Sequence, residues 1–98
     1  MNYYTYVLYS LMDNKLYIGV TNNLKKRLNA HITGRVKSTK SRRNLILVYC
    51  EICLNQKDAI KREKYFKTGF GRRFLHNRLE NYFKEKKFAG SRGGRVGS

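Results

Sequence analysis

The sequence predicts an α+β fold: a small three-stranded antiparallel sheet flanked by helices, in the order β-β-α-β-α-α. Two early segments rich in aromatic and β-branched residues are separated by a turn signal. Apolar residues then recur at helical spacing, and a further strand-like run precedes two more helical segments. Ninety-eight residues are enough for one compact domain and too few for two.

Two strands are expected at the start of the chain. Residues 3–10, YYTYVLYS, are rich in aromatic and β-branched side chains and predict the first strand. The second is predicted by apolar residues that recur with a period of two: Leu16, Ile18 and Val20. Because Asp13 and Asn14 form a turn signal between the two runs, we expect a hairpin.

A helix and an exposed loop follow. The helix is expected to be capped by Thr21 or Asn22 and to end at Gly34. Its apolar residues recur every four positions: Leu24, Leu28 and Ile32. Residues 35–44 carry five cations, no acid and no apolar periodicity, which predicts an exposed loop.

The second half of the chain predicts one strand and two helices. Residues 45–53, LILVYCEIC, predict a third, largely buried strand. Asn55 with Asp58 is an acidic variant of the capping box, so a helix is expected from there to about Thr68, with Gly69 as its stop. A last helix is expected from about Gly71 with one apolar face: Phe74, Leu75, Leu79, Tyr82 and Phe83.

The composition changes near the end of the chain. Residues 89–98, AGSRGGRVGS, are rich in Gly and Ser and have no apolar stripe, which predicts a flexible basic tail. Residues 1–88 are therefore assigned to a single domain.

The charge balance is strongly basic. Twenty-two Lys and Arg against six Asp and Glu give a net charge of +16, and such an excess attracts polyanions. We expect nucleic acid as the partner, with DNA first and RNA left open. No stretch approaches the roughly 20 apolar residues of a membrane-spanning helix, and no signal peptide is visible. A cytoplasmic protein without a membrane partner is expected.

Two cysteines are spaced as in some zinc sites. Cys50 and Cys53 would need two further ligands for a tetrahedral site, and His31 and His76 are too isolated to form a matching pair. Two small apolar residues in a strand are the simpler interpretation.

Glu63 is conspicuous because of its position. Ala59, Ile60 and Phe66 define the inward stripe of its helix, and Glu63 lies three or four residues from each. Burying a carboxylate is costly unless a cation or a metal compensates. A structural ion pair with a nearby Lys or Arg is one interpretation. The other is a metal carboxylate, since Mg²⁺ commonly uses one or two carboxylates with waters and substrate phosphates.

Two further groups of residues have side chains suited to chemistry. Arg27 and His31 are four apart on the first helix and so lie on one face, although a solvated basic helix with an incidental histidine has the same pattern. Tyr17 and Gly19 share one face of the second strand, and Gly19 permits a close approach of a backbone or ligand. Tyr6 can lie nearby through hairpin pairing, although any single one of the eight tyrosines is more often a packing residue.

As a spaced set, these residues resemble the GIY-YIG nuclease superfamily, most closely its small stand-alone bacterial members. The set consists of YTY at residues 4–6, ten further residues, YIG at residues 17–19, and then Arg27, His31 and Glu63. The resemblance covers residues 3 to about 83. The second triplet is intact, whereas Tyr4 and Thr5 replace the glycine and isoleucine of the first.

The resemblance implies a role for each residue. Tyr6 and Tyr17 would be the paired catalytic tyrosines, with Gly19 allowing close packing beside them. The remaining implied roles are Arg27 as the phosphate-binding arginine, His31 as an auxiliary or proton-handling group, and Glu63 as the sole protein ligand of one divalent ion, Mg²⁺ or Mn²⁺. Asn77 and Asn81 are available to replace an asparagine that some members place near the site. No small-molecule cofactor is implied.

The function implied by the resemblance is metal-dependent endonuclease activity on DNA phosphodiester bonds, with structure-selective cleavage in repair or recombination as the finer expectation. Seven cations are expected to contact nucleic-acid phosphates around the reaction centre: Lys26, Arg35, Lys37, Lys40, Arg42, Arg43 and Lys67. Two alternatives stay open. One is a nucleic-acid-binding module that keeps the fold without turnover. The other is a ribosome-associated basic protein, which explains the charge but not Glu63 on an inward stripe.

Overall fold

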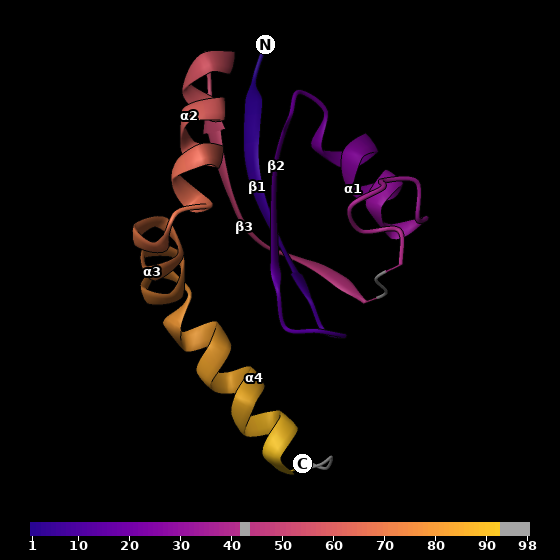
Figure 1. Ribbon diagram of the computed structural model, residues 1–98, viewed down its shortest axis with the longest axis vertical. Helices are drawn as coiled ribbons and strands as arrows, with labels where there is room; N and C mark the ends of the chain where they lie inside the picture. Colours follow the sequence, from indigo (N-terminus) through magenta and orange to yellow (C-terminus); the bar gives the residue numbers. More distant parts are fainter. Residues whose placement is uncertain (42–43, 93–98) are drawn as a thin grey trace.

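A three-stranded antiparallel sheet lies between helices (Figure 1). The computed structural model describes residues 1–41 and 44–92. The strands are β1 (Tyr3–Ser10), β2 (Leu16–Thr21) and β3 (Leu45–Cys53), and the helices are α1 (Leu24–Ile32), α2 (Gln56–Phe66), α3 (Gly69–Arg78) and α4 (Glu80–Arg92). The expected α+β class and three-stranded antiparallel sheet are confirmed, with one helix more than expected.

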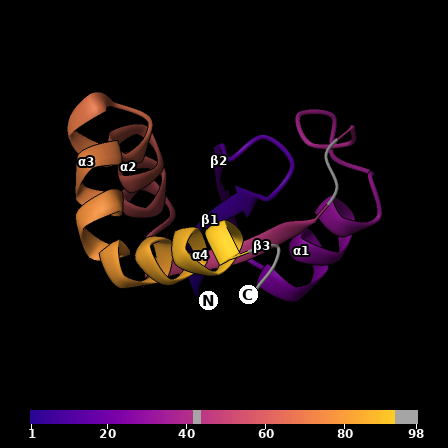
Figure 2. The same ribbon diagram turned by 90° about the horizontal axis from the view of Figure 1, so that it is seen from below.

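The sheet has the order β2-β1-β3, so the N-terminal strand is central. Every residue of β1 from Thr5 to Ser10 is buried, because β1 is paired on both edges and helices flank both faces. Figure 2 shows the strands in the space between α2 and α3 on one side and α1 on the other. Alternation along β1 therefore sends Val7 to the side of α2 and Tyr6 to the side of α1.

The predicted hairpin between β1 and β2 is confirmed. Asn14 adopts a left-handed backbone conformation with φ of 60°, which Asn tolerates better than most residues. The Asn14 amide donates to the Ser10 carbonyl at 2.8 Å, and the Tyr9 hydroxyl donates to Asn14 Oδ1 at 2.7 Å. This tight turn sets the register that places Tyr6 opposite Gly19.

The expectation that β3 is largely buried is wrong. None of its residues is fully buried, and Ile52 is 62% exposed. The apolar run reads like a central strand, but β3 pairs only with β1 and forms an edge of the sheet, so its outer side has no partner strand among the described residues.

The core joins β1 to α2 and α3. Val7, Phe66 and Leu75 are fully buried and form its centre. The unexpected Thr5 in the first triplet has a structural reason, because its buried hydroxyl donates to the Ala59 carbonyl of α2 at 2.8 Å. At Gly71, a Cβ atom would overlap the backbone of α2, so this glycine lets α3 pack closely against the preceding helix.

The single last helix expected from Gly71 is divided into α3 and α4. α3 begins at Gly69 and is capped by Thr68, whose side chain accepts from the Gly71 amide at 3.0 Å. Leu79 interrupts the helical geometry with φ of −108° and ψ of 21°. Leu75 can therefore remain in the core while Phe83 of α4 contacts the Tyr9 ring, with ring centroids 5.3 Å apart.

α4 continues beyond the expected end of the domain. It runs to Arg92, so residues 89–92 of the expected flexible tail are helical, and residues 93–98 lie outside the described part of the chain. The division into a domain of residues 1–88 and a tail of residues 89–98 stays a prediction. In residues 1–41 and 44–92, no helix is both long and apolar enough to cross a membrane.

α1 differs from expectation at its start and in its packing face. Its cap is Asn23 rather than Thr21 or Asn22, with Asn23 Oδ1 accepting from the Lys26 amide at 3.1 Å, because β2 continues through Thr21. Ile32 of the expected inward stripe is 65% exposed, and the buried residue of α1 is His31.

Candidate active site

Tyr6 has its hydroxyl at the meeting point of two secondary-structure elements. It lies in the middle of β1 and is 2% exposed. Its hydroxyl is 2.9 Å from His31 Nε2 and accepts a hydrogen bond from Arg27 Nε at 3.3 Å. Because Arg27 and His31 are one turn apart on α1, a single helical face presents both groups to one phenol.

Gly19 makes room for that phenol. It is the direct partner of Tyr6 in the β1–β2 ladder. A Cβ atom at Gly19 would overlap the hydroxyl and the adjoining ring carbon of Tyr6. The ring of Tyr6 therefore lies across the glycine, and any larger residue there would have to displace it.

His31 is held from both of its ring nitrogens. It is 4% exposed, and its Nδ1 is 2.7 Å from the hydroxyl of Thr39. Burial, together with the nearby Arg27 guanidinium, holds the pKa of His31 below its ordinary value of 6.5. The imidazole is therefore neutral at neutral pH, with one nitrogen able to accept a proton.

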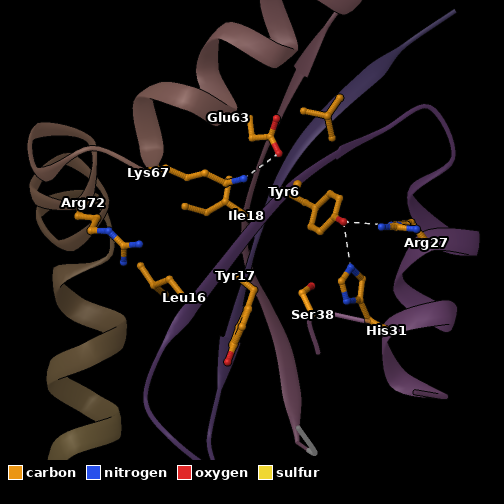
Figure 3. Close-up of a pocket in the computed structure, with 12 residues that line it drawn as sticks. Tyr6, Leu16, Tyr17, Ile18, Arg27, His31, Ser38, Glu63, Lys67 and Arg72 are labelled. Atoms are coloured by element: carbon orange, nitrogen blue, oxygen red, sulfur yellow. Dashed lines mark hydrogen bonds and ion pairs between the residues drawn. The ribbon is translucent and has the colours of Figure 1, made fainter. Parts of the chain in front are cut away.

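These groups border a cleft of about 420 Å³ at the outer side of β2 (Figure 3). We call it the β2 cleft. Figure 3 shows Tyr6, Arg27 and His31 directed toward one another, while Glu63, Lys67 and Arg72 approach from α2 and α3. Its polar lining residues are Tyr6, Tyr17, Arg27, His31, Ser38, Glu63, Lys67 and Arg72.

Glu63 is the carboxylate among the residues that line the β2 cleft. Its side chain is 24% exposed and forms an ion pair with Lys67 Nζ, one helical turn later, at 3.2 Å. No group of three or more His, Cys, Asp or Glu converges anywhere in the described residues. The Glu63 carboxylate offers oxygen ligands and borders the open cleft. It can therefore hold Mg²⁺ or Mn²⁺ only if substrate phosphates and waters complete the coordination.

Tyr17 lines the same cleft but is oriented differently from Tyr6. Its hydroxyl donates to Asp13 Oδ2 in the hairpin turn at 3.1 Å. Figure 3 shows its phenol directed away from the hydroxyl of Tyr6. The two tyrosines of the triplets therefore line one cleft with different orientations, and Asp13, predicted only as a turn residue, is a neighbour of Tyr17.

Five of the seven expected phosphate-binding cations lie in the described part of the chain, and they are dispersed. Lys67 lines the β2 cleft, and Lys26 lies on an exposed part of α1 outside it. Arg35, Lys37 and Lys40 are exposed in the segment after α1. Arg42 and Arg43 lie outside the described residues, so their predicted role stays a prediction.

Three cleft or site residues were missed from the sequence: Ser38, Thr39 and Arg72. Thr39 is fully buried within a loop that was expected to be exposed, and a lone threonine among cations carries no periodic signal. Arg72 is one of many cations in its helix, and only the packing of α3 against α2 brings it to the cleft.

Other residues considered from the sequence lie away from the cleft lining. Asn77 and Asn81 line a separate surface depression at the junction of α3 and α4. Cys50 and Cys53 are free thiols in β3, and burial raises the pKa of the Cys50 thiol. The two cysteines therefore fit the simpler interpretation of small residues in a strand.

Comparison with known proteins identifies the family. The profile of the GIY-YIG catalytic domain matches residues 2–77. A UPF0213 protein of Bacillus licheniformis is 37% identical over 90 residues, covering 91% of this chain and 87% of that protein. A UPF0213 protein of Limosilactobacillus reuteri is 43% identical over 68 residues, covering 66% of this chain and 70% of that protein.

A solved structure agrees with these matches. The solution NMR structure of the UPF0213 protein BH0048 from Bacillus halodurans is similar, with a TM-score of 0.51 and 26% sequence identity. It covers 79% of this chain and 84% of that chain. Because the domain profile spans most of the sequence and the relatives align along it, the chain belongs to the GIY-YIG family, a family of nuclease catalytic domains.

Proposed function

We propose that this protein is an endonuclease that hydrolyses DNA phosphodiester bonds with the help of one divalent metal ion. The observation that carries the proposal is the Tyr6 hydroxyl held between His31 Nε2 at 2.9 Å and Arg27 Nε at 3.3 Å, beside a cleft that Glu63 also lines. Hydrolysis of a phosphodiester needs an activated water, neutralised phosphate charge and a stabilised leaving oxygen. The cleft has side chains suited to each need.

Tyr6 is the group proposed to activate water. A phenol with an ordinary pKa of about 10 is a poor base at neutral pH unless its proton has somewhere to go. His31 is a neutral acceptor in hydrogen-bond contact with that phenol. The Arg27 guanidinium, on the other side of the hydroxyl, donates a hydrogen bond to the same oxygen and holds it in position.

Phosphate binding is proposed to involve cations on both walls of the cleft. Arg27 on α1 is exposed and can reach a phosphate while it still contacts Tyr6. Lys67 and Arg72 line the opposite wall. A divalent ion held by Glu63 would supply positive charge to the leaving oxygen.

DNA is the proposed substrate because the whole chain carries a net charge of +16 and the family is one of nucleases. Cations outside the cleft would contact the sugar-phosphate backbone without reading bases. Structure-selective cleavage in repair or recombination is the finer form of this proposal. A panel of duplex, branched and single-stranded DNA, with RNA included, tests that form directly.

A binding module without turnover is the second candidate, and the ion pair between Glu63 and Lys67 favours it. That contact gives the charge of Glu63 a partner, as expected of a residue in a structural ion pair. An i,i+4 pair of this kind contributes only about 0.2–0.5 kcal/mol, so a metal ion or a phosphate can readily compete for its partners.

The deciding experiment is Glu63→Gln, which keeps the shape of the side chain and removes the charge. We expect cleavage of labelled DNA in Mg²⁺ or Mn²⁺ to be lost, while DNA binding persists or becomes tighter because one negative charge near the phosphate is gone. Glu80→Gln is the matched control, since Glu80 also forms an i,i+4 pair with a lysine but on exposed α4. Normal cleavage by Glu63→Gln would refute the metal role, and no cleavage by the wild type would leave the binding module.

A further inference from the structure

We propose that Thr39 is a positioning residue that stabilises the Nδ1–H tautomer of His31, which leaves His31 Nε2 free to take the proton of Tyr6. The effect of this tautomer on catalysis rests on the proposed function. The tautomer itself is a property of the folded protein and can be measured without any substrate. Thr39 thus extends the site from the cleft into the buried loop behind His31.

Hydrogen-bond directions around Tyr6 point to this tautomer. Arg27 Nε can only donate, so the Tyr6 oxygen accepts from it. The one proton of the phenol is then left for His31 Nε2 at 2.9 Å. Within residues 1–41 and 44–92, no other acceptor forms a hydrogen bond with this hydroxyl, and the side chain is only 2% exposed.

Donor and acceptor roles can be assigned in the same way to the hydrogen bond between His31 and Thr39. A neutral imidazole has one donor and one acceptor nitrogen, so Nε2 as the acceptor places the hydrogen on Nδ1. That N–H then donates to Thr39 Oγ1 across 2.7 Å. In the opposite tautomer, both Arg27 and His31 would donate to the Tyr6 oxygen, and the proton of the buried phenol would have no acceptor.

The local fold holds Thr39 in place. Gly34, with φ of 77°, ends α1 in a Schellman turn, in which the Gly34 amide donates to the His31 carbonyl and the Arg35 amide to the Ala30 carbonyl. The chain then reverses, Val36 is buried, and the Thr39 amide donates to the Val36 carbonyl at 3.1 Å. Thr39 is fully buried against His31 as a result.

In the reaction, the tautomer decides where a proton can go. As water attacks phosphorus, its O–H bond breaks and the proton passes to the Tyr6 oxygen, while the Tyr6 O–H bond breaks and its proton forms the Nε2–H bond of His31. The P–O bond to the leaving group breaks with its electron pair, and that oxygen takes a proton from solvent. Throughout the reaction the Thr39 oxygen accepts a hydrogen bond from His31 Nδ1–H, and this bond stabilises the imidazolium that forms.

The first test is ¹⁵N NMR of the two histidine side chains in the metal-free wild-type protein above pH 7. His31 is distinguished from His76 by the spectrum of a His76→Gln variant. We expect His31 to show a protonated Nδ1 and an unprotonated Nε2. A protonated Nε2 in the wild type would overturn the inference, whatever the nuclease assays show.

The second test compares Thr39→Val, which keeps the shape and removes the hydroxyl, with Thr39→Ser, which keeps the hydroxyl. We expect Thr39→Val to lose the Nδ1–H tautomer and to lower kcat at least about tenfold with little change in KM, as for impaired proton transfer. Thr39→Ser should restore both the tautomer and kcat. An unchanged tautomer in folded Thr39→Val, or failure of Thr39→Ser to restore it, would overturn the proposal.

Discussion

Tyr6 and Gly19 depend on each other at the scale of single residues. The phenol can lie across β2 only because its ladder partner has no side chain. Conversely, a glycine is needed at position 19 because the ring of Tyr6 occupies the space where a side chain would lie. The bonds from Arg27 and His31 to the hydroxyl then hold the ring in that position.

Replacing Gly19 by alanine tests this dependence. The added methyl would overlap the Tyr6 ring, so Gly19→Ala should destabilise the fold by about 1–3 kcal/mol, as overpacking does, and should reduce cleavage. Gly69→Ala is the control, because a Cβ there meets no atom within 4 Å, and that change should be neutral or stabilising by about 0.4–1 kcal/mol. Urea unfolding measures both, and equal stabilities of the two variants would contradict the prediction.

Tyr6→Phe and Arg27→Ala should impair the enzyme in different ways. Loss of the phenol removes proton transfer and should lower kcat by about 10²–10⁴-fold with KM nearly unchanged. Loss of the Arg27 guanidinium should lower kcat and raise KM together, because a phosphate contact is made before and during reaction. Steady-state kinetics on one labelled substrate separates the two patterns, and wild-type turnover in both variants would leave only the binding module.

At the scale of secondary-structure elements, an ion pair joins β3 to α2. Arg62 Nε and Nη2 each donate to a separate Glu51 oxygen at 2.8 Å, and Tyr49 donates to Glu51 at 3.0 Å. The guanidinium also lies over the Phe66 ring, 4.6 Å from its centroid. This cluster connects the edge strand to the helix that carries Glu63, so it supports one wall of the cleft.

The pH dependence of stability reports on that ion pair. The Arg62 hydrogen bonds hold the pKa of Glu51 below its ordinary value of 4.5, so its contribution is present above that pH and is lost as pH falls through the folded-state value. Glu51→Gln should cost about 1 kcal/mol at pH 7, a difference that shrinks in acid. Denaturant unfolding at pH 7 and pH 3 measures it, and a loss as large at pH 3 as at pH 7 would contradict the assignment.

At the scale of the whole molecule, excess positive charge is the dominant property. The chain has twenty-two cations and six acids. Glu51 of β3 is paired with Arg62 of α2, and Glu63 and Glu80 are each paired with the lysine four residues later. The remaining cations cover several surfaces, so attraction to DNA has both a local part near the cleft and a diffuse part.

Neutralising two different triplets of cations tests whether the basic segment after α1 contacts phosphates. Changing Lys40, Arg42 and Arg43 to Gln should weaken binding to unrelated sequences equally and flatten the salt dependence by about 0.9 for each duplex DNA phosphate that is no longer bound. Changing the exposed Lys57, Lys61 and Lys64 on α2 removes the same charge outside the cleft lining and should flatten it less. Affinity across a salt series measures both, and identical slopes would mean diffuse attraction only.

The local patterns of this sequence were sufficient to predict the sheet, the hairpin and most helix positions, because strand and helix periodicities and turn residues act over a few neighbours. They also predicted that Tyr6 can lie near Gly19 across the hairpin and that Arg27 and His31 share one helical face. That these two pairs meet was implied only by the resemblance to the family, because the contacts between β1 and α1 are tertiary. The alternation in β2 correctly separated the face of Tyr17 and Gly19 from the face that meets α2.

Contacts between distant segments decided the remaining features. The exposure of β3 follows from its position at the edge of the sheet. The helix breaks at Leu79 because Leu75 and Phe83 pack in different places. Arg72 reaches the cleft because α3 lies close to α2. Thr39 meets His31 only after Gly34 reverses the chain. None of these contacts has a periodic signature, because each depends on how elements pack and not on how one element is built.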